Sequence, residues 1–258
     1  MANGAVSTYI GPMIRVKPAP VDIVAGALHE LQTPIAAILS AGENIRDGLL
    51  DSDRLREEGT TIVAQAIRLR NLWDQILLYA STGKIGPRRD IRTLTASEVI
   101  DRAIDGVSIL LQQGGFTLQR EIQMELPLLR GDLQLLSQCL ENLIANAVKY
   151  SGQSRWVGVS ALLGESSPHG GKEIRICVGD RGLGISAEDL PYIFEPFYRS
   201  RRPAVSQIRG SGLGLSIAKG CAEACGGVLS VVSQEGAGCV FTLHLPLRGE
   251  PAAEESGP

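Results

Sequence analysis

The sequence predicts two folded parts: a helical hairpin that pairs with a second copy as a dimeric four-helix bundle, followed by an α/β sandwich of one sheet layer and one helix layer. Apolar residues step by threes and fours through the first part, whereas the second mixes short β-branched runs with helical stretches. The expected divisions are a linker or flexible N-terminus at 1–20, the hairpin at 21–82, a hinge at 83–90, the α/β domain at 91–247 and a disordered tail at 248–258.

The hairpin prediction rests on two apolar seams. The seam positions are Leu28, Leu31, Ile35, Ile38, Gly42, Ile45 and Leu49 in the first helix and Ile62, Ala66, Leu69, Trp73, Ile76 and Ala80 in the second. Turn residues at 48–54 separate the helices, and Pro34 is expected to weaken and bend the first one. A further stripe, made of Val63, Ile67, Leu72 and Leu77, is more than one partner helix can cover. We therefore expect a homodimer with Trp73 in its core.

The second part is expected to combine helices and strands without strict alternation. Helical periodicity covers residues 97–111 and 133–150, and a further helix opens at the glycine tract 210–216 and runs towards Cys225. Strands are indicated at 156–162, 173–178, 228–233 and 239–245. A single sheet covered by helices accommodates both kinds of element.

Composition limits the environment and the partners. The 258 residues carry a formal net charge of -3, which gives no general attraction towards nucleic acid or an anionic membrane. No run approaches the roughly 18 apolar residues of a membrane span, so we expect a cytoplasmic chain without membrane contact of its own. The five cysteines are odd in number and scattered, as is typical of buried thiols in a reducing compartment. Cys221 and Cys225 share a helix face, but no histidine stands near them to complete a zinc site.

The first chemical candidate is the tract from Ala27 to Pro34. It contains His29, Glu30 and Thr33, an imidazole beside a carboxylate with a hydroxyl one helical turn later. An imidazole can attack phosphorus, and the adjacent carboxylate can accept its ring proton. A surface or packing histidine in an amphipathic helix is the alternative, and this tract alone leaves it open.

Two asparagines on one helix face are the second candidate. Asn142 and Asn146 are one turn apart, and the other face of their helix is apolar. Amide oxygens suit Mg²⁺ that is shared with phosphate oxygens. The alternative is two solvated asparagines, although asparagine is a middling-to-poor helix former.

A glycine tract after a predicted strand is the third candidate. In it Asp180 can accept a hydrogen bond from an adenine amino group, and Gly182 and Gly184 let the backbone approach a ligand. A glycine-rich hairpin turn is the alternative.

A second glycine tract, 210–216, opens a helix whose free N–H groups favour phosphates. It is not a P-loop, because no Lys-Ser/Thr follows it, and not a dinucleotide fingerprint, because no strand leads directly into it. Between the two glycine tracts, residues 198–209 are expected to form a mobile lid. Its arginines, Arg199, Arg201, Arg202 and Arg209, can meet phosphate or be solvated, and solvation is expected for most of them.

In this order the tracts resemble those of bacterial two-component sensor histidine kinases, over residues from about 21 to 246. Residues 28–34 resemble the family's phosphoacceptor box, and the asparagine, first glycine, phenylalanine (192–199) and second glycine tracts follow in family order. The resemblance implies a dimerisation and phosphoacceptor hairpin and a Bergerat-type ATP-binding domain of the GHKL class. It implies autophosphorylation with ATP and Mg²⁺ and transfer to an aspartate in the receiver domain of a response regulator, with phosphatase activity towards that regulator as an additional option.

The resemblance also implies roles for single residues. His29 would be phosphorylated, Glu30 would act as the base, and Thr33 would position water when the regulator is dephosphorylated. Asn146 would be the Mg²⁺ ligand. The other residues implied in nucleotide binding are Asn142, Lys149, Tyr150, Asp180, Gly182, Gly184, Ile185, Phe194, Arg209, Gly210, Gly212, Leu213, Gly214 and Leu215.

Two departures from the family pattern bear on these expectations. Gln32 occupies a usually basic position, and no sensing domain precedes residue 21, so we expect the cytoplasmic catalytic fragment of a longer, membrane-anchored sensor. One alternative is an ATP-hydrolysing enzyme of the same nucleotide fold, against which the helical part with His29 argues. Another is a non-catalytic dimeric scaffold that binds ATP, against which intact Asn146 and Asp180 argue.

Overall fold

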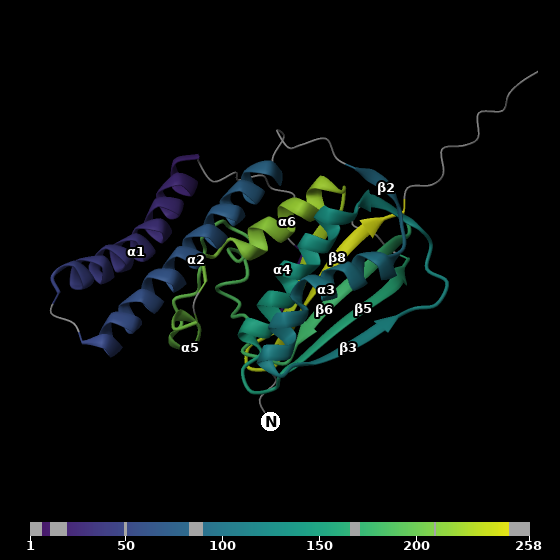
Figure 1. Ribbon diagram of the computed structural model, residues 1–258. Coiled ribbons are helices and arrows are strands. Elements are labelled where there is room, and N and C mark those ends of the chain that lie inside the picture. Colours follow the sequence, from purple (N-terminus) through teal and green to yellow (C-terminus); the bar gives the residue numbers. More distant parts are fainter. Residues whose placement is uncertain are drawn as a thin grey trace, which may run out of the picture.

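The computed structural model describes residues 7–10, 20–48, 51–82, 90–165, 171–208 and 210–247 (Figure 1). A pair of long helices stands beside a sheet that carries further helices on one face (Figure 1). The expected hinge, Asp90 excepted, and the expected tail lie outside the described residues.

The two long helices form the predicted hairpin. They are α1 (Pro20–Arg46) and α2 (Ser52–Thr82), which lie along one another. Asp51 fixes the start of α2, because its carboxylate accepts a hydrogen bond from the Arg54 N–H at 2.9 Å. α1 continues without interruption through Pro34, so the expected weak point lies within one continuous helix.

Six strands form the main sheet. They are β1 (Ser7–Ile10), β3 (Thr117–Ile122), β5 (Trp156–Gly164), β6 (Glu173–Asp180), β7 (Val228–Gln234) and β8 (Gly238–Pro246), in the spatial order β1-β7-β8-β6-β5-β3. β3 pairs with β5 in parallel, and the other neighbours are antiparallel. β2 (Ile91–Leu94) and β4 (Leu129–Asp132) form a separate two-stranded sheet.

Three helices cover one face of the main sheet, which confirms the predicted sandwich (Figure 1). They are α3 (Ala96–Gly114), α4 (Leu133–Tyr150) and α6 (Gly214–Ala224). A short helix, α5 (Pro203–Ser206), lies in the segment between the two glycine tracts. Asp132 caps α4 by accepting hydrogen bonds from the N–H groups of Gln134 at 3.0 Å and Leu135 at 3.2 Å.

Four strands were not predicted. β1 lies in the segment expected to be a linker, and that expectation is wrong for Ser7–Ile10, which pairs with residues 230–233 of β7. β2 and β4 have four residues each, and β3 is a largely exposed edge strand. Such strands carry little hydrophobic alternation, and pairing partners distant in the sequence stabilise them.

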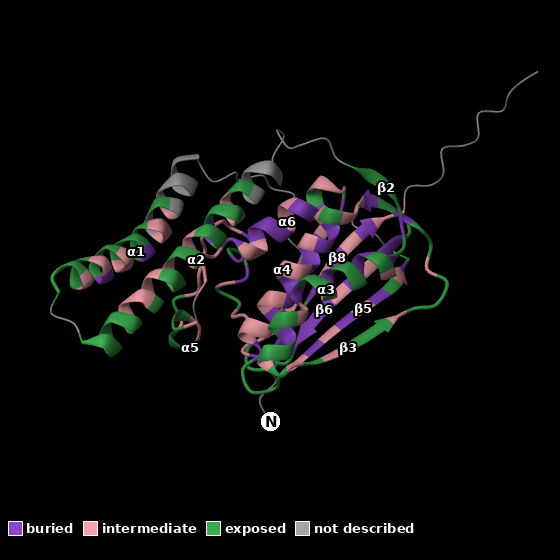
Figure 2. Ribbon diagram, viewed as in Figure 1, coloured by how far each residue is buried: buried purple, intermediate pink, exposed green. Residues whose placement is uncertain are grey.

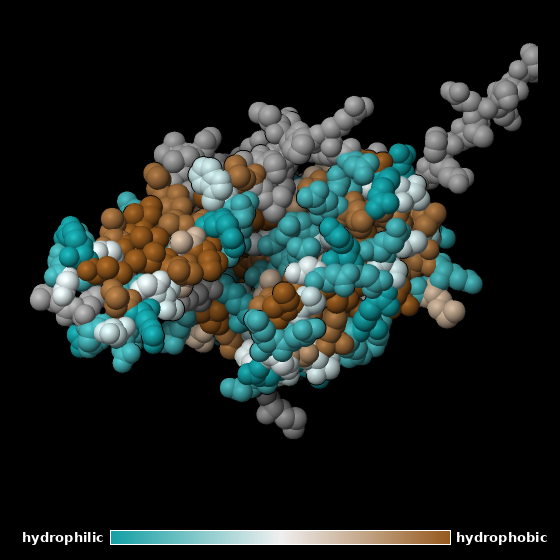
Figure 3. Space-filling model, viewed as in Figure 1, coloured by the Kyte–Doolittle hydropathy of each residue, from teal (hydrophilic) through white to brown (hydrophobic). Residues whose placement is uncertain are grey.

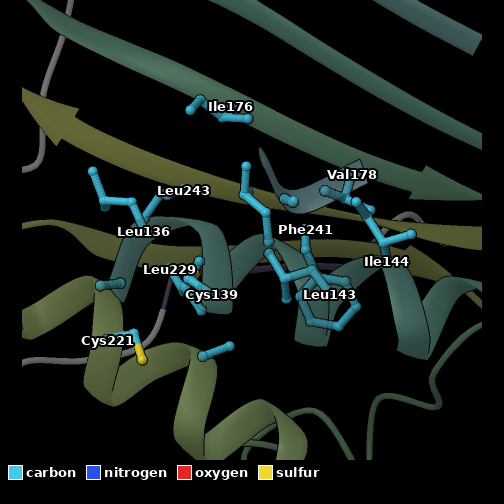
Figure 4. Close-up of a cluster of buried hydrophobic side chains, with 14 of the residues drawn as sticks. Leu136, Cys139, Leu143, Ile144, Ile176, Val178, Cys221, Leu229, Phe241 and Leu243 are labelled. Carbon is cyan, nitrogen blue, oxygen red and sulfur yellow. The ribbon is translucent and has the colours of Figure 1, made fainter. Parts of the chain in front are cut away.

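The core of the second part lies between the sheet and its helices (Figure 2). Ile144 of α4 lies near Val178 of β6, and Leu136 of α4 lies next to Leu243 of β8 (Figure 4). Leu143 and Ile176 belong to the same buried cluster. Since strand side chains alternate, every second residue of β6 faces the helices. The same alternation places the last residue of β6, Asp180, on the helix-covered face.

The cysteines and the helices bear on two expectations from composition. All five cysteines are free thiols, and Cys139, Cys221 and Cys239 are buried. In the part of the chain that the structure describes, no helix combines the length and apolar character needed to cross a membrane.

Candidate functional site

A pocket opens where α4, the end of β6, β8 and the start of α6 meet the segment that contains α5. Six of its lining residues were predicted for nucleotide binding: Asn146, Tyr150, Asp180, Gly184, Ile185 and Leu215. Nine others were not assigned to the site: Asp189, Ile193, Tyr198, Arg199, Ser200, Arg202, Val205, Cys239 and Phe241.

Asp180 is the buried charged group of the pocket wall. Its Oδ1 accepts a hydrogen bond from the Gly182 N–H at 2.9 Å, and its Oδ2 accepts one from Cys239 Sγ at 2.9 Å. Burial raises the pKa of the Asp180 carboxyl above its ordinary value, although these two hydrogen bonds act in the opposite direction. A carboxylate held in this way can accept an N–H from a ligand in the pocket.

Gly182 and Gly184 are required by contacts within the protein. A Cβ on Gly182 would overlap the carbonyl oxygen of Tyr150, and one on Gly184, whose φ is 61°, would overlap that of Gln234. These glycines were expected to let the backbone approach a ligand, but in the structure they let it approach neighbouring backbone. This close packing has a consequence for the pocket. The contact of Gly182 with Tyr150 holds the turn after β6 against the end of α4, where Tyr150 lines the pocket.

The asparagines, which helix spacing places on one face of α4, lie with Lys149 at the second glycine tract. A Cβ on Gly214 would lie 3.3 Å from Asn142 Oδ1 and 3.9 Å from Asn146 Oδ1. A Cβ on Gly210 would overlap Lys149 Nζ. Amide oxygens, an ammonium group and the free N–H groups at the start of α6 thus surround this tract, which suits phosphate oxygens together with Mg²⁺.

Gly212 also has a positive φ, of 75°, and its carbonyl accepts a hydrogen bond from the Phe197 N–H at 3.1 Å. Asn142 Nδ2 donates to the Gln138 carbonyl at 2.9 Å, so only the oxygen of this amide is directed at the tract.

The segment between the glycine tracts is held by its own hydrogen bonds. Arg199 donates to the carbonyls of Ser206 at 3.3 Å and Ile208 at 2.8 Å, and Arg202 forms an ion pair with Glu235. The expectation that most of these arginines are solvated is therefore wrong for Arg199 and Arg202. Arg209 lies outside the described residues.

Tyr198 and Asp189 join this segment to the pocket wall. The Tyr198 hydroxyl donates to Asp189 Oδ1 at 2.7 Å. Burial, followed by this hydrogen bond, raises the pKa of Tyr198 to about 12.

Two predicted residues lie behind the pocket. Phe194 is buried edge-on against Phe241, with ring centroids 6.4 Å apart, and Leu213 is fully buried. Phe241 lines the pocket and Phe194 supports it. Neither Phe194 nor Leu213 lines the pocket, contrary to the expectation that both contact the nucleotide. Apolar side chains in helix-start or turn segments pack into the core when core space is available.

The unassigned pocket residues had weak sequence signals. Tyr198 belongs to the phenylalanine tract and carries no predicted role, and Arg202 belongs to the expected lid, where contact with phosphate and solvation are the alternatives. Asp189, Cys239 and Phe241 belong to no motif. Cys239 reaches Asp180 because β8 pairs with β6 in the register that sets these two residues opposite each other, a fact of tertiary pairing.

The phosphoacceptor tract lies on α1. The backbone of His29 is part of the helix, and its side chain lies outside the described part of the structure. Glu30 Oε2 lies 3.6 Å from Arg68 Nη2 of α2. Thr33 is exposed. No local motif predicts that Arg68 is the charged partner of Glu30.

Besides packing α2 against α6, the hairpin contacts the loops of the pocket through Gly26 and Gln75. A Cβ on Gly26, three residues before His29, would lie 2.7 Å from the ring of Phe197, so this ring packs directly on the α1 backbone. Ser211 Oγ of the second glycine tract donates to Gln75 Oε1 of α2 at 2.7 Å. The two parts therefore meet through the phenylalanine and second glycine tracts as well as through the packing of α2 on α6.

Two family models match the chain in consecutive regions. Residues 21–84 match the His Kinase A (phospho-acceptor) domain, and residues 131–249 match the family of histidine kinase-, DNA gyrase B- and HSP90-like ATPases. The order of the two domains is the order of the hairpin and the sandwich in the structure.

A relative agrees with this assignment, and solved structures share the fold. The Sensor-like histidine kinase SenX3 of Mycobacterium tuberculosis is 29% identical over 244 residues, which are 95% of this chain and 58% of that protein. The histidine kinase ThkA, solved in complex with the response regulator protein TrrA, aligns with a TM-score of 0.66 at 20% identity over 87% of this chain and 61% of that chain. Full-length ShkA, solved in complex with AMPPNP, aligns at 0.61 and 21% identity over 89% of this chain and 46% of that chain. With 58% of SenX3 covered, the chain spans less than two thirds of the length of that protein.

A phosphoacceptor hairpin followed by a GHKL-type ATPase domain defines the class, and the chain belongs to the sensor histidine kinases of two-component systems.

Proposed function

We propose that this chain is the kinase core of a two-component sensor, which phosphorylates His29 with ATP and passes the phosphoryl group to an aspartate of a response regulator. The observation that carries the proposal is the joint presence of Asp180 and Asn146 in one pocket wall of a chain whose first helix contains His29. The complex of ThkA with a response regulator supports the kind of partner.

The pocket suggests how the nucleotide would lie. An adenine amino group would donate to Asp180, and the phosphates would extend towards Gly210, Gly214 and the start of α6. Asn146 would hold Mg²⁺ together with the phosphates, and the ion would neutralise their charge during transfer. Lys149 Nζ stands beside the same tract. ShkA, whose fold is similar, was solved with AMPPNP.

The transfer itself needs little from the ATPase domain beyond position and charge. An imidazole nitrogen of His29 would form a bond to the γ-phosphorus while the bond from that phosphorus to the ADP oxygen breaks. Glu30 would take the proton that leaves the ring. Its carboxylate, which lies beside Arg68, would then have to accept a hydrogen bond from the imidazole as well.

We also propose that the working unit is a homodimer. Among the hairpin side chains that the structure describes, eight large apolar ones are exposed in the single chain: Leu28, Ile35, Leu39, Leu55, Val63, Ile67, Trp73 and Leu77. Apolar surface is spread over the hairpin (Figure 3). A second hairpin would cover much of this surface and take Trp73, which is 56% exposed in the single chain, into a four-helix core.

Incubation with γ-labelled ATP and Mg²⁺ tests the kinase. We expect label on the protein that is lost in acid and stable in alkali, as a phosphohistidine is, and that is absent from His29→Gln. His244→Gln is the matched control, because it changes a histidine of β8 and should keep the label. Asn146→Ala should remove the label and leave the dimer intact.

Three results would contradict the proposal: label that persists in His29→Gln, label that is stable in acid, and release of phosphate without any labelled protein. The last result would favour an ATPase of the same fold. Transfer to a purified receiver domain, followed by loss of the histidine label, would then test the second half of the reaction.

A further inference from the structure

The Asp180 carboxylate, which would bind the nucleotide base, has a hydrogen-bond partner outside the sequence tracts described above. Asp180 is the last residue of β6 and Cys239 the second residue of β8, and the two residues stand directly opposite each other in the antiparallel register. Directly opposed residues project on the same face of a sheet, so the thiol lies beside the carboxylate. Both side chains line the pocket and both are buried.

The hydrogen bonds of Asp180 fix the plane of its carboxylate. Oδ1 is held by the Gly182 N–H and Oδ2 by the Cys239 thiol, each at 2.9 Å. A carboxylate oxygen has two lone-pair sites, so each oxygen keeps one further site for a donor in the pocket. If the thiol were absent, Oδ2 would lose this donor, and only the backbone N–H groups of Gly182 and Cys239 would be left to define the rotation of the group.

The chemical state of Cys239 suits a donor. Burial, followed by the negative charge of Asp180, raises the pKa of the Cys239 thiol well above its ordinary value. The sulfur therefore keeps its proton at neutral pH and is a poor nucleophile. Its contribution is a hydrogen bond to a charged acceptor, a class of bond that is stronger than one between neutral groups.

We propose that Cys239 is a positioning residue for base recognition: its thiol orients the Asp180 carboxylate so that the pocket selects a purine with an exocyclic amino group at position 6. This proposal rests on the proposed function, because it takes adenine as the base that Asp180 contacts.

A pair of nearly isosteric variants tests the hydrogen bond. Cys239→Thr keeps a donor, whereas Cys239→Val has the same shape without one, and both β-branched side chains suit a strand. The dissociation constants of ATP and of inosine triphosphate, which carries an oxygen in place of the amino group, are measured by calorimetry with the full chain. The readout is the dissociation constant of inosine triphosphate divided by that of ATP, which measures the preference for the amino group.

We expect the ratio for Cys239→Thr to stay within about twofold of the wild-type ratio, and that for Cys239→Val to fall by about tenfold, the equivalent of one neutral-to-charged hydrogen bond. Cys139→Ala is the matched control, since Cys139 is a buried thiol of α4 that does not line the pocket. It should lower the unfolding midpoint and leave the ratio unchanged.

An unchanged ratio in Cys239→Val would overturn the role of Cys239, whatever the stability of that variant. If Cys239→Val does not fold, Cys239→Ser against Cys239→Ala gives the same comparison of donor with no donor. The proposed function fails separately, because in that case the wild-type chain itself would bind the two nucleotides equally or bind neither.

Discussion

The hairpin and the ATPase domain bury their apolar side chains in different ways. In the ATPase domain the large apolar residues of α3, α4 and α6 close on the sheet, and many of them, such as Leu143 and Ile176, have no exposed surface. Of the hairpin side chains that the structure describes, Ala41 and Leu72 are the buried hydrophobic ones, and Leu72 belongs to the cluster of the ATPase domain. Leu39 and Val63 remain 60% and 59% exposed.

This difference indicates that the two parts reach stability by different routes. The ATPase domain has a closed core and can fold as one chain, whereas the hairpin has two helices whose apolar stripes exceed their mutual contact. In the proposed dimer the helix pair gains stability from association, so its stability should depend on protein concentration.

The largest effect is expected from the core of the ATPase domain. Leu143→Ala should lower its unfolding free energy by about 2–5 kcal/mol, because it leaves a cavity among fully buried neighbours. Ile109→Ala on the same sheet-covering layer changes a side chain that is 68% exposed and should stay within about 0.5 kcal/mol of the wild type. Urea unfolding followed by circular dichroism measures both, and equal losses in the two variants would contradict a closed core.

The next effect concerns the hairpin. Val63→Asp should weaken dimerisation about 100-fold, which is about 2.8 kcal/mol, because it buries a charge in the proposed interface. The unfolding of the ATPase domain should stay unchanged. Sedimentation equilibrium measures the association, with Glu57→Asp as a control on the same helix. A dimer of wild-type strength in Val63→Asp would rule out this face as the interface.

A third effect tests the far end of the sheet from the pocket. Glu173 is fully buried and its Oε1 accepts from His244 Nδ1 at 3.0 Å and from Arg175 Nε. Burial alone would raise the pKa of the Glu173 carboxyl, and the hydrogen bonds from His244 and Arg175 outweigh it, so the pKa lies below its ordinary value of 4.5.

A carboxyl with a lowered pKa in the folded state stabilises the fold above its unfolded pKa, and this contribution is lost as the pH falls through the folded pKa. The unfolding free energy should therefore decrease below pH 4.5. Glu173→Gln should cost about 1–2 kcal/mol at pH 7 and flatten the acid limb. Denaturant titrations at pH 7 and at pH 4 measure this, and an acid limb as steep as that of the wild type would show that Glu173 does not contribute to it.

The smallest effect concerns the contact between the two parts. Gln75→Ala removes the acceptor of the Ser211 hydroxyl and should cost about 0.5–1.5 kcal/mol of docking. Amide hydrogen exchange at residues 211–214 should rise about two- to tenfold, with Asp74→Ala as the control for an exposed neighbour. Equal exchange in both variants would mean that this contact does not hold the glycine tract.

Sequence patterns predicted the elements that carry strong periodicity. The boundaries of α4 at residues 133 and 150 follow from its apolar stripe and from turn residues at both ends. The shared helix face of Asn142 and Asn146 could be predicted because helix spacing alone defines it, whereas their meeting with the second glycine tract depends on the packing of α4 against α6. The strands β1 to β4 could not, since they are short or exposed and depend on partners far away in the sequence.

The pocket divides in the same way. Asp180 was found because a glycine tract marks it, whereas Cys239 was missed because its role depends on the register between β6 and β8. The ion pair of Arg202 with Glu235 joins residues 33 positions apart, and no local pattern distinguishes it from a solvated arginine. Roles that arise from tertiary pairing of unremarkable residue types are therefore the ones that single-sequence patterns miss.

The pairing of β1 with β7 limits how far the hairpin can travel. Nine residues separate Ile10 from Pro20, and a fully extended stretch of this length spans about 35 Å at most. While β1 remains in the sheet, the beginning of α1 stays within that radius of the sheet edge. The other end of the hairpin is joined to β2 by the chain itself, so the ATPase domain is attached at two places. A movement that carries the nucleotide to His29 is then a rotation between two attachment points, and detaching β1 would enlarge its range.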